Sequence, residues 1–218
     1  MRSILILAGP SAVGKTTVMK KMMEKDGRFE FIRSATTRAP RGDGHDNEYI
    51  YVSREEFLSR IENGKMLEYM EYGENFYGTP ASEIERIFDL GKTPLLILDI
   101  VGVNSIKSTE RDFRTIAMYI YDDLDVMEER LYSRELAHNP TEQALATFIK
   151  RKNANICDYD NIPSYAHLFD AFIKNDTVDS SADRALCELD RLISGGERSN
   201  DEISTIVNSL KASAQAKK

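Results

Sequence analysis

Short apolar runs alternate along the chain with segments of helical periodicity. Four runs rich in leucine and β-branched residues predict buried strands, at residues 3–8, 93–100, 114–121 and 167–176. Apolar residues at three- and four-residue intervals predict helices at residues 15–25, 54–63, 81–90, 124–136, 141–156 and 178–193. This order favours an α/β fold with a parallel sheet and right-handed crossovers.

Residues 29–80 interrupt the alternation. The segment is polar and rich in turn-forming and aromatic residues, and EYIYVS (residues 48–53) alternates as a strand does. Ser53 and Glu56 form a capping box, which predicts that a helix begins at residue 54. We therefore expect a smaller lobe inserted into the α/β core.

The tail, residues 197–218, differs from the core. It follows a pair of glycines and contains one weakly amphipathic stretch before a small, polar end. This pattern predicts a loosely docked helix and a disordered terminus.

Composition is that of an ordinary globular protein. Of the 218 residues, 41% are hydrophobic and 30% are charged. The formal net charge of −7 disfavours a broad surface for nucleic acid or for an anionic membrane. No apolar run reaches the length of about 18 residues that a membrane helix needs, and the N-terminal run ILILA leads directly into a glycine turn. We expect a cytoplasmic protein that binds neither nucleic acid nor membrane.

Cysteine and histidine usage predicts neither a disulfide nor a metal centre built from side chains alone. Cys157 and Cys187 fit reduced core thiols of a cytosolic protein. His45, His138 and His167 lie far apart and show no ligand spacing.

The strongest chemical signal is a phosphate-binding loop between the first predicted strand and helix, which fits G-x-x-x-x-G-K-[ST]. Its residues are Gly9, Pro10, Ser11, Ala12, Val13, Gly14, Lys15 and Thr16, followed by Thr17. Glycines let backbone N–H groups turn inward, and the helix N-terminus favours an anion. Lys15 supplies charge for the outer phosphates and Thr16 a hydroxyl for Mg²⁺. The loop therefore predicts a nucleoside triphosphate bound with Mg²⁺.

A second group of polar residues indicates another anion site. Arg38 and Arg41 lie three residues apart around Pro40, and two guanidinium forks suit a phosphate. A solvated loop is the alternative. Tyr49 and Tyr77 could add hydroxyl donors to the same group, or could be core tyrosines.

Five segments, in order, carry a family resemblance. They are GPSAVGKTT, SATTRAPR, EYIYVS, EYMEYGENFYGTP, and LLILDI followed by GVNSIK. In sequence and spacing they resemble guanylate kinase over about residues 3–193, and the TTRxPR and YGT elements are the most distinctive. RLYSREL, FIKRKNA and FIKND resemble its lid and last strand more loosely. The resemblance implies a P-loop NTPase-type parallel sheet flanked by helices, with an inserted GMP-binding lobe and a helical lid.

The same resemblance implies how the chain is organised. One domain would span residues 1–196. Within it, the nucleotide-monophosphate-binding lobe would cover about residues 33–80, and the lid with its flanking helices about residues 124–156. Residues 197–218 would remain as the tail.

The resemblance also implies a GMP site. Its residues would be Ser34, Arg38, Arg41, Tyr49, Glu68, Tyr77, Thr79 and Asp99. Guanine presents two donors beside one acceptor, so a carboxylate such as Glu68 can accept both donors, and a hydroxyl such as Thr79 can donate to the acceptor. Taken alone, Glu68 would be a surface glutamate and Thr79 the N-cap of the next helix.

Three arginines match the lid residues that close over the transferring phosphate. They are Arg130, Arg134 and Arg151. The first two follow a pair of glutamates, so ordinary helix salt bridges are the alternative. Asn175 resembles the residue near the adenine of the donor nucleotide.

The chain departs from the family pattern in three places. A second aspartate usually stands two residues after the one that matches Asp99, and this chain lacks it. Gly44 stands where a glutamate is usual, with Asp43 beside it as a substitute. Ala12 replaces a frequent glycine, which we expect to be a mild change. Together these departures allow a slow or altered enzyme.

The implied function is ATP-dependent phosphorylation of GMP to GDP, with Mg²⁺. A phosphate monoester with a second pKa of about 6 is mostly dianionic at neutral pH, so no general base is needed. Lys15 and the lid arginines would stabilise the moving phosphoryl group while Arg38 holds the acceptor. One alternative is a phosphotransferase for another phosphorylated acceptor, such as a ribose bisphosphate, and the other is a catalytically silent binding module. The use of dGMP and the oligomeric state stay open.

Overall fold

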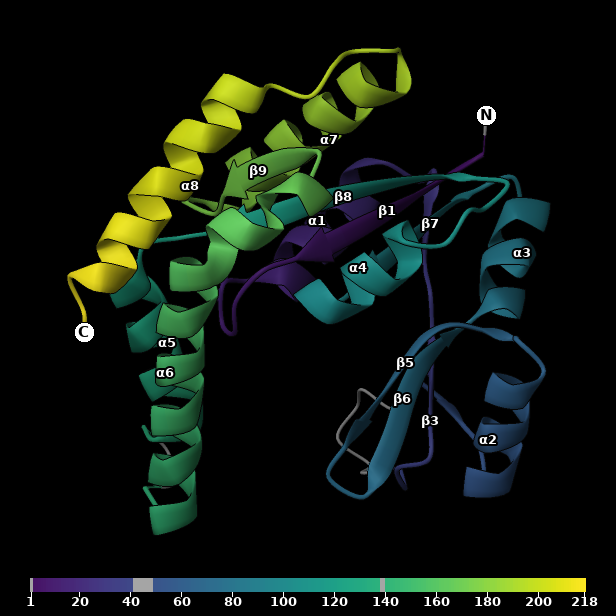
Figure 1. The fold of residues 1–218 in the computed structure, drawn as a ribbon, viewed down its shortest axis with the longest axis horizontal. Helices are drawn as coiled ribbons and strands as arrows, with labels where there is room; N and C mark the ends of the chain where they lie inside the picture. The colour runs from purple at the N-terminus through teal and green to yellow at the C-terminus, as the bar shows by residue number, and fades with distance from the viewer. Residues whose placement is uncertain (1, 41–48, 138–139) are drawn as a thin grey trace. The chain divides into compact units, whose positions relative to one another are not determined.

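The computed structural model describes residues 2–40, 49–137 and 140–218 (Figure 1). A five-stranded parallel sheet has the order β2-β7-β1-β8-β9, and a mixed four-stranded sheet has the order β4-β3-β6-β5. The strands are β1 (Ser3–Ala8), β2 (Phe29–Phe31), β3 (Ser34–Thr36), β4 (Tyr49–Tyr51), β5 (Met66–Tyr72), β6 (Asn75–Pro80), β7 (Thr93–Ile97), β8 (Arg114–Tyr121) and β9 (Ala171–Lys174). The helices are α1 (Lys15–Lys25), α2 (Arg54–Glu62), α3 (Ala81–Asp89), α4 (Ile100–Lys107), α5 (Leu124–Glu135), α6 (Glu142–Tyr165), α7 (Val178–Ile193) and α8 (Asn200–Gln215).

The predicted α/β class is confirmed, and the central strands are buried as their apolar runs indicate. In β1 every residue after Ser3 is buried, and β8 is buried from Ile116 to Ile120. Such uninterrupted apolar strands are typical of parallel sheets covered by helices. The predicted bounds of β1, α1, β8 and α7 are also confirmed.

The chain forms two compact units, which we describe separately. The first comprises residues 1–5 and 26–115 and contains the mixed sheet with α2, α3 and α4. The second comprises residues 6–25 and 116–218 and contains the phosphate loop with α1 and α5 to α8.

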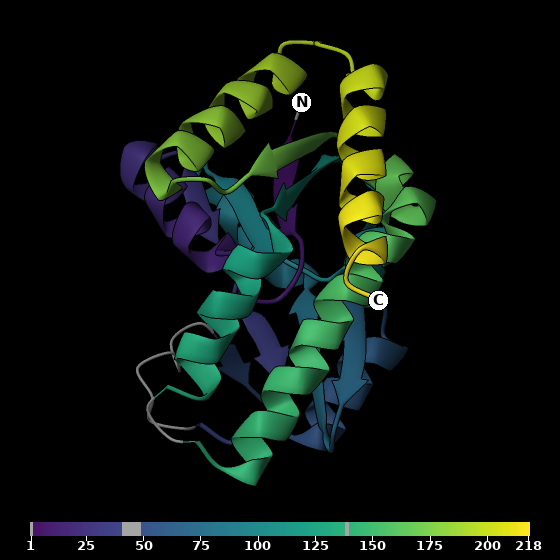
Figure 2. The ribbon, with the colours of Figure 1, turned by 90° about the vertical axis from the view of Figure 1, so that its left-hand side faces the viewer.

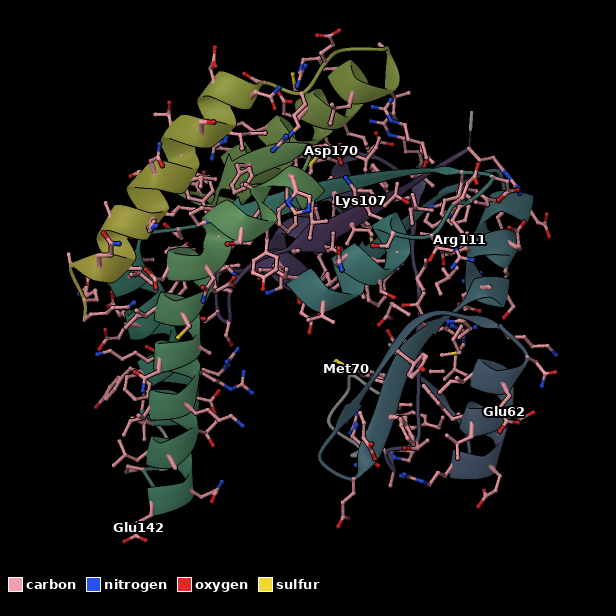
Figure 3. The ribbon with its side chains drawn as sticks, viewed as in Figure 1. Glu62, Met70, Lys107, Arg111, Glu142 and Asp170 are labelled. Carbon is pink, nitrogen blue, oxygen red and sulfur yellow. The ribbon has the colours of Figure 1, made fainter. Side chains whose placement is uncertain are left out.

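The mixed sheet has one apolar and one polar face. Ala35 and Phe76 belong to a buried cluster with Phe57 of α2, and the rings of Phe57 and Phe76 stack with centroids 5.3 Å apart. Successive residues of a strand face opposite sides, so the residues between these positions form the other face. In Figure 3, Glu62 is labelled on α2, and Met70 of β5 lies on the opposite side of the strands. The α2 side supplies the hydrophobic core of this sheet, and its opposite side is left for polar residues.

Helix α2 begins as its sequence predicts. The Ser53 hydroxyl accepts a hydrogen bond from the Glu56 N–H at 3.1 Å, which satisfies one of the donors left open at a helix start. The capping box therefore fixes the point at which the chain leaves the sheet and enters α2.

Four strands and one helix had no predicted bounds, namely β2, β3, β5, β6 and α4. Strand β2 has three residues at the edge of its sheet, which is too short for a periodic signal. Helix α4 begins at Ile100, where a single strand was expected to run over residues 93–100. The strand ends at Ile97 because the Asp99 carboxylate accepts the Gly102 N–H at 2.8 Å and so starts the helix.

Two predicted boundaries in the C-terminal half of the chain, the end of α6 and the start of β9, are wrong. Helix α6 was expected to end at residue 156 but runs to Tyr165, because Tyr159 and Ile162 continue its buried face past Asn155. Strand β9 covers residues 171–174 alone, since a 3-10 turn over residues 166–168 occupies the start of the predicted run.

The tail is more ordered than its sequence predicts. Helix α8 buries Ile203, Val207, Leu210 and Ala214, and it lies beside α6 in Figures 1 and 2. The predicted disordered terminus is therefore wrong as far as Gln215. Four apolar residues at helical spacing were enough to dock this segment, although its overall composition is polar.

The start of α8 is held by the backbone of its own unit. The Arg198 guanidinium donates to the carbonyl oxygens of Ala166 at 2.7 Å and of Phe169 at 2.8 Å. These bonds satisfy two acceptors of the turn before β9.

None of the helices in the described ranges is both long enough and apolar enough to cross a membrane.

The prediction that Cys157 and Cys187 are core thiols is wrong. Both cysteines are exposed, Cys157 on α6 and Cys187 on α7.

Candidate active site

The phosphate loop has the backbone that its two fixed glycines predict. Gly9 has φ 141° and Gly14 has φ 96°, a region that favours glycine. A Cβ at Gly9 would collide with the Ile120 carbonyl oxygen, and one at Gly14 would collide with the Asn175 side chain. Both positions therefore need glycine for conformation and for space.

Ala12 is strained, which makes its replacement of glycine more than the mild change that was expected. Its φ is 61°, and among the described residues it is the one non-glycine with positive φ. An L-residue in the left-handed region costs about 1–2 kcal/mol, because its Cβ approaches the following carbonyl. The loop holds this residue in a conformation that its sequence disfavours.

Lys15 is held over the loop by two carbonyls. Its Nζ donates to the Gly9 oxygen at 2.7 Å and to the Pro10 oxygen at 2.8 Å. Thr16 and Thr17 are exposed in the first turn of α1. The first N–H groups of a helix have no partner within it, so this turn presents donors and the positive end of the helix dipole.

The three predicted lid arginines all reach the loop. Arg130 Nη1 donates to the Val13 carbonyl at 3.4 Å, while Arg134 and Arg151 donate to the Ser11 hydroxyl at 3.4 and 3.1 Å. Among the described residues, no ion pair joins Arg130 or Arg134 to the two glutamates before Arg130, although Arg134 does form a helix salt bridge with Glu135.

The carboxylates that face these arginines are different ones. Arg130 Nη2 lies 3.0 Å from Asp122 Oδ2, and Arg134 Nε donates to Glu135 at 2.9 Å. Glu128, one of the glutamates expected to pair with them, instead binds Lys152 at 2.6 Å. The arginines are therefore oriented by residues at the end of β8 and the end of α5.

A cavity of about 510 Å³ opens at the loop. It is lined by the loop and the start of α1, by Arg130 and Arg134, and by residues 175–178. Its volume is in the range of pockets that hold small molecules.

Asn175 lines this cavity and is 3% exposed. Its Nδ2 donates to the Val13 carbonyl at 2.7 Å. Its Oδ1 is buried with no hydrogen-bond partner among the described residues. An acceptor left in this state costs free energy until a donor reaches it.

Five predicted acceptor-site residues lie on the polar face of the mixed sheet. The strand register pairs Ser34 with Tyr49 and Glu68 with Thr79, and Tyr77 lies two residues before Thr79 on the same face. The rings of Tyr49 and Tyr77 are 6.3 Å apart, edge to face. The sheet therefore brings together residues that are up to 45 positions apart in sequence, from Ser34 to Thr79.

Arg38 points over the same face. Its guanidinium carbon lies 5.1 Å from the centroid of the Tyr49 ring, and its Nη2 donates to the Tyr51 hydroxyl at 3.4 Å. Arg38 is therefore half-buried against two tyrosine rings. Arg41, Asp43 and Gly44 lie outside the described residues.

Glu68 and Thr79 form a buried pair. Glu68 is 8% exposed and Thr79 is 1% exposed, and the Thr79 hydroxyl donates to Glu68 Oε1 at 2.6 Å. Burial raises the pKa of Glu68 above its usual value, the hydrogen bond from Thr79 lowers it, and the charge of Asp99 raises it further. Glu68 is therefore buried and is not a surface glutamate. Thr79 is not the N-cap of α3, because Pro80 occupies that position.

Asp99 is exposed and acts as the N-cap of α4. It is near enough to Glu68 to influence its pKa. Val101 stands where the family usually has a second aspartate, and it is 72% exposed in the first turn of α4. This apolar side chain has no packing role that would explain it.

Several residues of the site were not predicted from the sequence. Asn155 binds the backbone of Ser11, Tyr51 contacts Arg38, and Asp122 and Glu135 contact the lid arginines. Tyr51 could have been found, since it lies two residues after Tyr49 in an alternating strand. The others depend on tertiary contacts that leave no local pattern.

No cluster of histidine, cysteine or carboxylate side chains in the described parts of the chain could hold a metal ion by itself.

A parallel α/β sheet, a glycine-dependent phosphate loop at a helix N-terminus and arginines gathered on that loop define a P-loop nucleotide kinase. The family model of guanylate kinase matches residues 1–194. A guanylate kinase of Streptococcus thermophilus (strain CNRZ 1066) is 36% identical over 186 residues, which cover 83% of this chain and 82% of that protein. A guanylate kinase of Sus scrofa is 34% identical over 180 residues, 81% of this chain and 86% of that protein. The chain belongs to the guanylate kinase family.

A solved structure agrees with the family assignment. The crystal structure of guanylate kinase from Anaplasma phagocytophilum has a TM-score of 0.56 and 27% sequence identity, over 86% of this chain and 84% of that one. The predicted resemblance is thereby confirmed, and helix α8 lies beyond the matched residues 1–194.

Proposed function

We propose that this protein transfers the terminal phosphoryl group of ATP to GMP and so forms ADP and GDP. The observation that carries the proposal is the buried Glu68 carboxylate on a polar sheet face, in a chain of the guanylate kinase family. A buried carboxylate needs donors, and the base of GMP brings two of them.

Glu68 would read the guanine base. Its two oxygens can accept the ring N–H and the exocyclic amine together, whereas adenine would place a ring lone pair against the carboxylate. Thr79 donates its hydroxyl proton to Glu68, so Thr79 would orient that carboxylate. This role differs from the direct donation to guanine that the sequence led us to expect. A mismatch that leaves buried polar groups unpaired can discriminate by about 10⁴.

Arg38 would hold the phosphate of GMP, and Tyr49 and Tyr77 would add hydroxyls beside it. The stacking of Arg38 on Tyr49 limits its rotamers, which suits a fixed guanidinium fork. Ser34, Arg41 and Asp99 complete the proposed acceptor site. Since these residues address the base and the phosphate, dGMP is a second acceptor worth testing.

The phosphate loop would hold ATP. Backbone N–H groups of residues 12–17 and the Lys15 ammonium would bind the phosphates, and the Thr16 hydroxyl would bind Mg²⁺ held by them. The buried Asn175 Oδ1, which lacks a partner among the described residues, is suited to accept an N–H from the adenine amine. When bound, Mg²⁺ would neutralise charge on the outer phosphates.

The reaction needs positioning and charge stabilisation rather than a general base. The phosphate of GMP is mostly dianionic at neutral pH because its second pKa is about 6. Lys15, Arg130, Arg134 and Arg151 would stabilise the charge that spreads over the transferring group. Each arginine now bound to loop oxygens would exchange that contact for a phosphate oxygen.

We further propose that residues 1–196 form the catalytic domain, with an acceptor lobe at about residues 33–80 and a lid at about residues 124–156. Helix α8 would be an addition to this domain. The family's reaction needs nothing from it directly.

An acceptor panel tests the proposal. ADP release is measured with ATP and Mg²⁺ and with GMP, dGMP, AMP, CMP or UMP as acceptor. We expect activity with the guanine acceptors alone, reduced by about 100-fold or more in Lys15→Ala and in Arg38→Ala. Equal rates with all acceptors would refute base recognition, activity on a base-free ribose bisphosphate would favour the alternative phosphotransferase, and binding without turnover would favour a silent binding module.

A further inference from the structure

One buried side chain holds the phosphate loop by its backbone. Asn155 of α6 is 4% exposed. Its Oδ1 accepts the Ser11 N–H at 2.9 Å, and its Nδ2 donates to the Ser11 carbonyl at 3.0 Å. A single amide thus pairs with both polar backbone groups of one loop residue, as a neighbouring strand would.

The Ser11–Asn155 pair lies next to the strained residue of the loop. Ser11 directly precedes Ala12, whose φ of 61° is unfavourable for alanine. Fixing both backbone groups of Ser11 fixes the peptide that enters Ala12. Without that hold, Ala12 would be drawn to negative φ, and the N–H groups of the loop would turn with it.

Helix α6 presents Asn155 rigidly. Four residues further on, Tyr159 is fully buried, and its hydroxyl donates to the Asp122 carbonyl at 2.6 Å and accepts the Asp122 N–H at 3.0 Å. One turn before Asn155, Arg151 donates to the Ser11 hydroxyl. The same helix therefore contacts the backbone and the side chain of Ser11.

We propose that Asn155 is a positioning residue for ATP binding, which holds the phosphate loop in its nucleotide-binding conformation against the strain at Ala12. No other neutral side chain of this length offers a donor and an acceptor in one plane. The inference rests on the proposed function and acts through the loop, since Asn155 itself would touch no substrate.

Binding of a non-hydrolysable ATP analogue with Mg²⁺, measured by calorimetry, tests the inference. In Asn155→Ala we expect the dissociation constant to rise about tenfold, with the KM for GMP changed less than about twofold. Asn155→Asp keeps the shape and the acceptor but loses the donor and adds a negative charge near the phosphates, so it should weaken binding at least as much. Asn153→Ala, an exposed asparagine on the same helix, is the matched control and should bind as the wild type does.

A second pair of variants separates positioning from general damage. Ala12→Gly removes the strain that Asn155 opposes, so the loss caused by Asn155→Ala should be smaller in that background. Either replacement of Asn155 leaving a folded protein with wild-type affinity for the analogue would overturn the inference. A rise in the KM for GMP as large as the rise in the dissociation constant of the ATP analogue would also overturn it. A wild-type chain that does not bind the analogue would instead refute the proposed function.

Discussion

Ala12 stores backbone strain inside the loop that binds phosphate. Strain of this kind is kept at functional sites when the surrounding contacts determine the conformation. Here the Ser11–Asn155 pair on one side and the buried Val13 on the other supply those contacts. The residue is therefore a place where stability and site geometry can be tested separately.

Ala12→Gly should stabilise the protein. Relief of the left-handed conformation outweighs the greater freedom of glycine in the unfolded chain, and we expect a gain of about 1 kcal/mol in the free energy of unfolding. Chemical denaturation measures it. Ala39→Gly, at an exposed loop position with ordinary φ, should be slightly destabilising. A loss of stability in Ala12→Gly would show that the strain at Ala12 has been misjudged.

Glu68 should make GMP binding depend on pH. Its pKa is raised chiefly by burial, so the ionised form costs folding stability at neutral pH, and this cost disappears as the pH falls below the raised pKa. Guanine binding has the opposite requirement, since the carboxylate must be ionised. We expect the KM for GMP to rise on acidification in the wild type.

Glu68→Gln separates the two effects. The variant should keep or raise the melting temperature, raise the KM for GMP at neutral pH by about tenfold or more, and flatten its dependence on pH relative to wild type. Both proteins bind the same GMP, so titration of the GMP phosphate cancels in the comparison. A steep dependence retained in Glu68→Gln would assign the effect to another group.

At the scale of elements, the C-terminal helix is part of the packed structure. Its buried face follows the spacing i, i+4, i+7 and i+11, from Ile203 to Ala214, and its neighbour α6 carries Arg151 and Asn155. Whatever holds α6 in place also fixes the residues with which it contacts the phosphate loop. Helix α8 therefore packs on the helix that carries two of the contacts to the loop.

A charge on the buried face of α8 should be costly. Val207→Asp places an unpaired carboxylate among apolar residues and should lower the free energy of unfolding by about 3 kcal/mol or more. Asn208→Asp introduces the same side chain one residue along on the exposed face and should change stability by less than about 0.5 kcal/mol. Equal effects of the two substitutions, measured by denaturant titration, would mean that α8 does not pack in solution as described.

The elements show what sequence patterns can and cannot predict. The phosphate loop, β1, β8, α1 and α7 were predicted because each has a strong local signal. Strand β2 is too short to have a periodic signal. Helix α6 extends past its predicted end because Tyr159 is buried through its contacts with Asp122. Alternation predicted one strand of the mixed sheet, over residues 48–53, and the residues on the polar face of that sheet were expected from the family resemblance. Asn155 is identified by its tertiary contact with Ser11 and by no local pattern.

At the scale of the whole molecule, the proposed donor and acceptor residues belong to different compact units. The loop, Arg130, Arg134, Arg151 and Asn175 lie in the unit of residues 6–25 and 116–218. Ser34, Arg38, Tyr49, Glu68, Tyr77, Thr79 and Asp99 lie in the unit of residues 1–5 and 26–115. Because the described residues of each proposed set fall within one unit, we expect substitutions in one set to change the binding of one nucleotide more than that of the other.

Phosphoryl transfer between two bound nucleotides can be followed by ³¹P NMR of ATP, GMP and Mg²⁺ with catalytic amounts of the protein. We expect each γ-phosphate of ATP that is lost to be matched by one β-phosphate of GDP and one β-phosphate of ADP, together with the loss of one GMP, with no inorganic phosphate formed. Loss of the γ-phosphate to inorganic phosphate, or an unchanged spectrum from a folded protein, would contradict the account.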